Sequence, residues 1–327
     1  MKLLMLGGTE FVGRAIVEDA LDRGWDVTVF HRGRHAAPPG TSALHGDRTA
    51  PDGLTALAEG EWDLVVDTWS GAPVVVRDSA RLLAGRVGQY TYISSRSVYV
   101  YPSPAGLGEA GAVVEGSPDA EAVAYSEDKR GGELAVEAAF GDHALLVRAG
   151  LIIGPYENVG RLPWWLNRVA RGGPLLAPGR PDLPLQYIDV RDLARWTLDA
   201  AAAGRGGAYD VVSPRGHATM GSLIAACAAA TGGAVEPRWT ADDVIEKAGV
   251  EPWTELPIWL PEGELHDYIF GADVTKALDA GLTCRPVEET AADTWAWLRS
   301  LGGVAPHRPD RPKKGISAER EAALLGL

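Results

Sequence analysis

Tyr125 and Lys129 are the two side chains whose types and spacing most clearly suggest chemistry. They stand four residues apart in the segment YSEDK, and residues at that spacing share one face of a helix. An ammonium group beside a phenol favours the phenolate and lowers the pKa of the tyrosine. The pair is therefore suited to acid and base catalysis on a carbonyl oxygen. Because a chance pair at this spacing is not rare, a second partner is needed.

A serine-rich run supplies that partner. The segment SSRSVY at residues 94–99 directly follows the apolar run YTYI. In a parallel sheet, the carboxyl ends of the strands line the ligand crevice. A serine hydroxyl at this edge can therefore hydrogen-bond the carbonyl that Tyr125 would protonate.

The segment MLGGTEFVGR at residues 5–14 has the pattern of a phosphate-binding turn. Gly7 and Gly13 occupy the first and third glycine positions of G-x-x-G-x-x-G, and Glu10 occupies the middle one. A glycine turn that leads into a helix presents free N–H groups and the positive end of the helix dipole to an anion. We expect this turn to bind the diphosphate of a dinucleotide.

The end of the second expected strand bears on the choice of cofactor. An acid there accepts from the 2′-OH of NAD, whereas an arginine pairs with the 2′-phosphate of NADP. VTVF is followed by His31-Arg32-Gly33-Arg34 and no acid. This favours NADP(H), with Arg32 as the expected contact and Arg34 in reserve; the alternative is a solvated basic loop. Asp47 is either an acceptor for the adenine amino group or an exposed turn residue.

The elements that must position these residues form an α/β pattern. Apolar runs alternate with segments of helical period, which predicts a Rossmann-like, doubly wound parallel sheet with a smaller, interleaved α/β substrate lobe. The first helix shows the helical period most clearly and should stop at Gly24. Its apolar positions are Phe11, Val12, Ala15, Ile16 and Leu21.

The two lobes are expected to alternate along the chain. We predict a dinucleotide-binding domain at 1–155 and about 186–203, the second part being a strand and a helix capped by Asp189 or Asp192. The substrate lobe should cover about 156–185 and 204–301, where tryptophan, proline and glycine are frequent. Residues 302–327 should form a C-terminal tail with a short helix that begins at Ser317.

Composition limits the partners of the protein. The 327 residues carry a net charge of −13, so nucleic acid is not an expected partner. No export signal opens the chain, and its apolar runs are shorter than the ~20 residues of a membrane-spanning helix. Neither the two cysteines nor the seven histidines have metal-ligand spacing. We expect a cytoplasmic, metal-free protein; its oligomeric state is open, with a homodimer as one option.

These segments together resemble the extended, atypical short-chain dehydrogenase/reductases of the NAD-dependent epimerase/dehydratase superfamily, and specifically its GGTxFxG subgroup. The resemblance covers nearly the whole chain. The matching segments are LGGTEFVG, SSRSVY, YSEDK with Glu133, LLVRAGLIIGP with Arg148 and Pro155, and LQYIDVRDLARW.

The resemblance implies roles for single residues. Ser95 would polarise the substrate carbonyl, Tyr125 would exchange the proton, and Lys129 would hold the nicotinamide ribose. The phosphate turn would comprise Gly7, Gly8, Thr9, Phe11, Val12 and Gly13, with the Glu10 side chain pointing away and the cofactor bound more loosely. The expected substrate contacts are Arg96, Tyr156, Trp164 and Trp165.

Two other departures from the family pattern matter. Asn158 and Asn167 are the only asparagines, and neither matches the asparagine of the family's catalytic tetrad. Arg96-Ser97 stands where related sugar-nucleotide dehydratases carry an acidic pair, which disfavours a dehydratase.

Three functions follow as hypotheses. The first is an NADP(H)-dependent reductase or dehydrogenase of a small or medium carbonyl or alcohol compound. The second is a nucleotide-sugar epimerase or dehydratase that retains NAD. The third is a non-catalytic RNA-binding or redox-sensing relative, against which the acidic charge and the Tyr125/Lys129 pair both argue.

Overall fold

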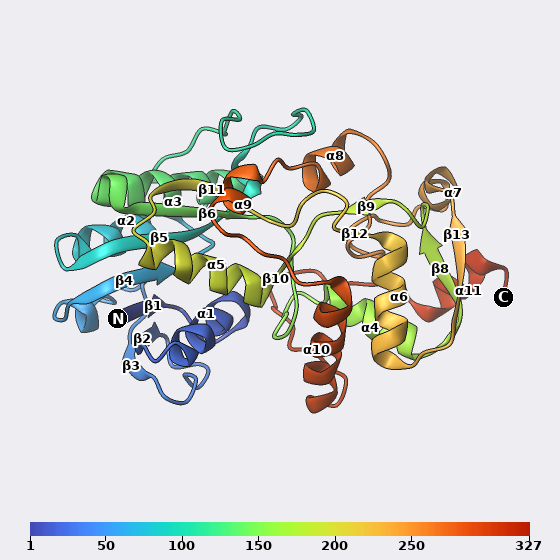
Figure 1. The fold of residues 1–327 in the computed structure, drawn as a ribbon, viewed down its shortest axis with the longest axis horizontal. Helices are drawn as coiled ribbons and strands as arrows, with labels where there is room; N and C mark the ends of the chain where they lie inside the picture. The colour runs from blue at the N-terminus through green and yellow to red at the C-terminus, as the bar shows by residue number, and fades with distance from the viewer.

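A seven-stranded parallel sheet forms the centre of the larger lobe (Figure 1). The computed structural model describes residues 1–327. The order β11-β6-β5-β4-β1-β2-β3 changes direction at β1, which is the arrangement that opens a crevice at the carboxyl ends of the strands. The strands are β1 (Lys2–Leu6), β2 (Asp26–His31), β3 (Ser42–His45), β4 (Trp62–Asp67), β5 (Val87–Ser95), β6 (Ala144–Ala149) and β11 (Gly207–Val211).

Helices cover both faces of this sheet, which is why its strands are apolar on both sides. Alternate residues of β1 point to opposite faces. Leu3 and Met5 pack with α1 (Phe11–Asp22) and α5 (Val190–Ala202). Leu4 and Leu6 pack with α2 (Pro73–Leu83) and α3 (Tyr125–Phe140) on the other face.

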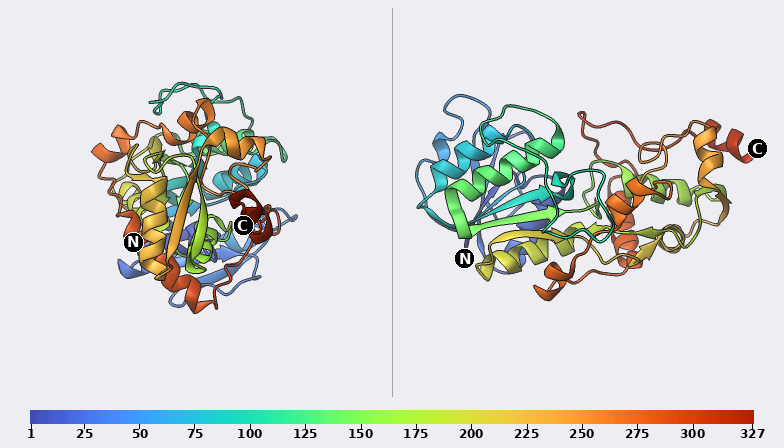
Figure 2. Two further views of the ribbon diagram at one scale, coloured as in Figure 1. Left: turned by 90° about the vertical axis from the view of Figure 1, so that its right-hand side faces the viewer. Right: turned by 90° about the horizontal axis from the view of Figure 1, so that it is seen from above.

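The smaller lobe has a separate apolar core. Its helices α4 (Arg161–Ala170), α6 (Met220–Thr231) and α10 (Val287–Ser300) pack against one another. The strands β8 (Gly173–Pro178) and β13 (Val235–Thr240) form a parallel pair. Figure 2 shows the two lobes side by side, with the N-terminus in the sheet lobe and the C-terminus at the far end of the other.

Short elements complete the chain. Two small strand pairs join β7 (Ile152–Ile153) to β10 (Ile188–Asp189) and β9 (Pro184–Leu185) to β12 (Ala218–Thr219). The short helices are α7 (Asp242–Lys247), α8 (Glu264–Phe270), α9 (Thr275–Asp279) and α11 (Ala318–Leu325). The 3₁₀ turns are η1 (Thr55–Leu57), η2 (Arg96–Val98) and η3 (Gly141–His143).

The structure confirms the predicted α/β class and parallel sheet. Asp189 caps α5 by accepting from the N–H of Arg191 at 2.8 Å, and Ser317 caps α11. One predicted boundary is corrected: β11 and α9 lie with the sheet, although the sequence assigned residues 204–301 to the substrate lobe. None of the helices combines the length and the hydrophobicity that a membrane span requires.

Candidate active site

The glycine turn between β1 and α1 has the shape that a diphosphate needs. Gly7 and Gly8 adopt φ values of 109° and 93°, which side chains disfavour. A Cβ on Gly13 would lie 2.7 Å from the backbone nitrogen of Gly8, so α1 can approach the turn only without a side chain there. The turn therefore fits the dinucleotide expected from the sequence.

Glu10 does not need the conformational freedom of glycine. It precedes α1 in an extended conformation, with φ −139°. Its half-exposed carboxylate lies 3.5 Å from Nδ2 of Asn158 and 3.8 Å from Nε2 of His35. The carboxylate thus turns toward these two side chains.

Lys129 is buried one helical turn after Tyr125 in α3. Its Nζ donates to the carbonyl oxygens of Trp69 at 2.6 Å and Ile93 at 2.7 Å. Burial lowers the pKa of Lys129 to about 7, against the opposing effect of nearby carboxylates. In its protonated form Lys129 has three donors, so one N–H is then left for a ligand.

α3 lies close enough to the sheet to place Lys129 at the strand ends. A Cβ on Gly132 would lie 2.6 Å from the hydroxyl oxygen of Tyr92 in β5. Tyr92 in turn donates to the carbonyl oxygen of Trp69, just beyond β4. Glycine in α3 thus allows the close contact between helix and strand that fixes Lys129.

Tyr125 is the first residue of α3, and its side chain is partly exposed. The guanidinium carbon of Arg311, from the C-terminal tail, lies 5.6 Å from the centroid of its ring. The phenol is therefore accessible, and a cation from a distant part of the chain flanks it.

The two adjacent serines at the end of β5 have different surroundings. Ser94 is buried, and its Oγ donates to Glu133 at 2.7 Å. Ser95 is only half-buried, and its Oγ accepts from the N–H of Ser97 at 3.1 Å. Ser95 is thus the less buried of the two serines, and its role toward a substrate stays a prediction.

A buried ion pair supports this strand end. Glu133 accepts from Nε and Nη2 of Arg148 at 2.8 and 2.9 Å, in addition to Ser94. Arg148 also donates to the hydroxyl of Tyr99 at 3.1 Å. Glu133 and Arg148 belong to the segments that resemble the family, and the sequence assigns them no role. The structure shows that they join α3 to β6.

Arg96 requires a correction. It was expected to contact substrate, but it is buried and its Nη1 donates to Asp210 of β11. Tyr99 donates to the same carboxylate at 2.9 Å. A buried guanidinium must be paired, so Arg96 links the serine segment to the edge of the sheet.

Arg48 and Asp67 form a second buried pair, which sequence reasoning missed. Nη1 and Nη2 of Arg48 donate to the two oxygens of Asp67, each at 2.7 Å. Tyr90 also donates to Asp67 at 2.7 Å. The one sequence signal for this contact is the position of Asp67, a carboxylate at the end of the apolar run LVVD.

The basic loop predicted to contact the adenosine end of the cofactor follows β2. Arg32 and Arg34 are exposed after β2. Asp47 accepts from the N–H and hydroxyl of Thr49 at 3.0 and 2.7 Å. These bonds, followed by the nearby arginines, lower the pKa of Asp47. The predicted cofactor contacts thus lie together, and their roles stay predictions.

The expected aromatic wall divides into three different environments. Trp165 is fully buried and donates to the carbonyl oxygen of Pro257 at 2.7 Å, so it belongs to the core and corrects the prediction of a substrate contact. Trp164 is partly exposed and packs on the tail at Gly315. Tyr156 lies under the guanidinium of Arg14, 4.2 Å from its ring centroid.

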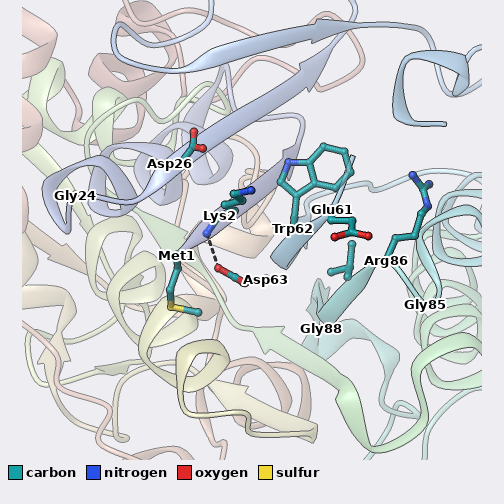
Figure 3. A pocket seen from close by; sticks show the side chains of 11 residues that line it. Met1, Lys2, Gly24, Asp26, Glu61, Trp62, Asp63, Gly85, Arg86 and Gly88 are labelled. Atoms are coloured by element: carbon teal, nitrogen blue, oxygen red, sulfur yellow. Dashed lines mark hydrogen bonds between the residues drawn. The ribbon is translucent and has the colours of Figure 1, made fainter. Parts of the chain in front are cut away.

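A shallow cavity of about 680 Å³ lies at the opposite edge of the sheet (Figure 3). Its lining includes Lys2, Asp26, Trp62 and Val87, which begin four of the strands. Ligands of open α/β sheets bind at the carboxyl ends, so this cavity is not the candidate site.

Solved structures with the same fold are numerous. UDP-glucuronic acid 4-epimerase from Bacillus cereus, in complex with NAD, is 14% identical, with a TM-score of 0.65 over 92% of this chain and 99% of its own. UDP-glucose 4-epimerase from Thermotoga maritima is 17% identical, with a TM-score of 0.64 over the same shares. WbmH from Bordetella bronchiseptica, in complex with NAD⁺, is 18% identical, with a TM-score of 0.63 and again the same shares.

Sequence comparison identifies the family. No curated protein matches the chain. The family model described as NAD dependent epimerase/dehydratase family matches residues 3–212, which is well over half of the chain and includes the glycine turn, Ser95, Tyr125 and Lys129. The resemblance expected from the sequence is confirmed. This chain belongs to the NAD dependent epimerase/dehydratase family.

Proposed function

We propose that this protein is an enzyme that oxidises an alcohol or reduces a carbonyl, using a nicotinamide cofactor and the residues Ser95, Tyr125 and Lys129. One observation carries the proposal. Lys129 is buried with two of its N–H groups bonded to backbone carbonyls, one turn from an accessible Tyr125. An ammonium held in this way has one donor left for a ribose hydroxyl.

The chain's own residues divide the work. Gly7 and Gly8 allow the left-handed turn that would present backbone N–H groups to a diphosphate, and Gly13 lets α1 approach that turn closely. Tyr125 takes the proton of the substrate hydroxyl during oxidation and returns it during reduction. Ser95 hydrogen-bonds the same substrate oxygen and stabilises the charge that develops there. When bound, the nicotinamide ring accepts or delivers the hydride of the reacting carbon.

A retained NAD and a nucleotide-sugar epimerase reaction have the support of the comparisons. The family is described as NAD dependent, and two of the solved relatives are named as epimerases of UDP sugars. Such a reaction oxidises the substrate and reduces it again, so Tyr125 would act in both half-reactions. Arg96-Ser97 stands where related dehydratases carry an acidic pair, and Arg96 itself is engaged by Asp210. Both points disfavour the dehydratase branch.

A reductase with exchangeable NADP(H) is the second candidate, and the loop after β2 favours it. Arg32 and Arg34 are exposed there, and no acid stands at the strand end. A guanidinium is well suited to a 2′-phosphate.

Cofactor content and affinity distinguish the two candidates. Purified protein would be denatured and its released nucleotide identified by mass spectrometry, and the apoprotein titrated with NADH and NADPH. Arg32→Ala and Arg34→Ala would be compared with Arg299→Ala, a matched charge removal on α10. Tightly held NAD supports the epimerase. A preference for NADPH of about tenfold that is lost only in the loop variants supports the reductase. Protein that binds neither nucleotide contradicts both candidates.

A further inference from the structure

The C-terminal tail passes beside the candidate active site. The N–H of Arg308 donates to the carbonyl oxygen of Asn158 at 3.0 Å, and that of Gly315 donates to Thr254 at 2.8 Å. Between these two attachments, the guanidinium of Arg311 flanks the ring of Tyr125. The tail therefore brings a cation to the residue proposed to move the proton.

Two further cations meet at the start of α4. Nζ of Lys314 donates to the carbonyl oxygen of Trp253 at 2.8 Å. The guanidinium carbon of Arg161 lies 5.8 Å from the centroid of the Trp253 ring. A Cβ on Gly160 would lie 3.9 Å from the Cβ of Lys314. The tail and α4 thus bring Arg161 and Lys314 together at Trp253.

These cations keep unused hydrogen-bond donors. Nε of Arg161 is buried and has no partner, and its Nη1 reaches only the carbonyl oxygen of Ile152 at 3.4 Å. Nε of Arg311 is 3.7 Å from Asp310, whose oxygens already accept from Arg308 at 3.0 and 2.7 Å. A buried donor without a partner destabilises the fold, and a ligand oxygen would remove that cost.

The local charge is positive after the carboxylates are counted. The oxygens of buried Glu157 accept from the N–H groups of Arg161 and Leu162 at 2.7 and 3.1 Å, and Asp310 is paired with Arg308. Burial and then the charges of Arg161 and Arg311 lower the pKa of Lys314, with Glu157 and Glu251 acting in the opposite sense. With Asp310 and Arg308 counted as a neutral pair, two carboxylates, Glu157 and Glu251, remain against three cations. These cations are Arg161, Arg311 and Lys314.

The geometry points to an oxyanion-binding subsite made by Arg161, Arg311 and Lys314, which holds a carboxylate or phosphate ester of the substrate beside the oxygen that Tyr125 protonates. This inference rests on the proposed function, because it specifies the substrate of that same site. Arginine binds such groups through paired, charge-assisted hydrogen bonds. A substrate of this class would supply acceptors for the donors that the protein leaves unpaired.

Anion binding to the full-length protein tests the subsite without a known substrate. Inorganic phosphate, succinate and UDP would each be titrated calorimetrically in the presence of saturating NAD, and also without it. We expect at least one of them to bind, and Arg311→Ala and Lys314→Ala each to weaken it about fivefold or more. Lys313→Ala removes the same charge from the adjacent, exposed tail position and should leave the affinity unchanged. Arg311→Lys keeps the charge and should restore most of the binding.

Each result has a distinct consequence. Tightest binding of phosphate or UDP identifies a phosphate ester, and tightest binding of succinate identifies a carboxylate. Failure of the wild type to bind any of the three, or equal losses in Lys313→Ala and Arg311→Ala, overturns the subsite. The wild type could bind an anion but no nicotinamide nucleotide. If the variants then lose anion binding, the subsite is supported and only the proposed function is contradicted.

Discussion

The Glu133–Arg148 ion pair gives a stability prediction that can be worked out from the contacts. Both residues are buried, and two hydrogen bonds of 2.8 and 2.9 Å join them. Glu133→Gln replaces one carboxylate oxygen with an NH₂ group that faces the guanidinium of Arg148, which leaves that buried charge uncompensated. It also removes the anion from Arg130, whose Nη1 donates to Glu133 at 2.9 Å. Breaking a buried pair in this way costs about 3–5 kcal/mol.

The size of the chain converts that free energy into a temperature shift. An unfolding entropy of about 2.1 cal/mol/K per residue gives about 0.7 kcal/mol/K for 327 residues. Glu133→Gln should therefore lower Tm by about 4–7 °C. Differential scanning calorimetry measures this shift, and urea denaturation gives the corresponding free energy of unfolding.

Two further variants make the test specific. Glu137 lies on the same helix with a partly exposed carboxylate 3.6 Å from Arg130, so Glu137→Gln should change Tm by less than about 1 °C. The double variant Glu133→Gln/Arg148→Met removes both charges and should be at least about 2 kcal/mol more stable than the sum of the single changes. A Tm of Glu133→Gln within 1 °C of the wild type, or strict additivity in the double variant, would refute the reasoning.

Three other changes have defined outcomes. Gly13→Ala should weaken NADH binding at least tenfold and destabilise the fold by about 1–3 kcal/mol, because its Cβ would lie 2.7 Å from Gly8 N; unchanged NADH fluorescence titration would contradict this. Glu10→Gln should strengthen NADH binding about two- to threefold by removing a half-exposed negative charge from the turn expected to bind the diphosphate, an effect that 0.5 M salt should abolish. Burial lowers the pKa of Lys129 to about 7, whereas an unfolded lysine titrates near 10.4. Between these two pH values the unfolded chain binds more protons than the folded chain. Lys129 therefore makes the free energy of unfolding rise with pH across that window. Urea denaturation of Lys129→Met should lack this rise, and an identical pH profile would argue against the lowered pKa.

The fold was largely predictable because its signals are local in sequence. Strands buried on both faces give short apolar runs, and the turn at Gly7 leads directly into a helix with a clear apolar period. β11 was missed because its sequence, GAYDV, contains no such run. It joins the edge of the sheet by pairing with β6 from about 60 residues earlier, and this pairing depends on topology that one segment does not encode.

The part of the candidate site that lies within single segments could also be predicted from the sequence, and the part that joins distant segments could not. Tyr125 and Lys129 lie on one helix, so their spacing places them together. Arg96 pairs with Asp210 across the sheet, and Arg311 contacts the ring of Tyr125 from the tail. Both contacts join residues far apart in sequence, so no spacing within one segment predicts them. Trp164 and Trp165 are adjacent in sequence, yet only the direction of each side chain from α4 decides which one is core.

The most direct test of the central claim is the affinity for NADH of three variants, followed by the fluorescence of the bound nicotinamide. Lys129→Met removes the donor expected at the ribose and should weaken binding about 10- to 100-fold, whereas Tyr125→Phe should bind NADH like the wild type and lose turnover. Lys276→Met is the matched control, because Nζ of Lys276 also donates to a backbone carbonyl, that of Ala208 at 2.6 Å, but lies beside β11 on α9. Equal affinities in Lys129→Met and Lys276→Met, with the fold of both intact by circular dichroism, would contradict the assignment of Lys129 to the nicotinamide site.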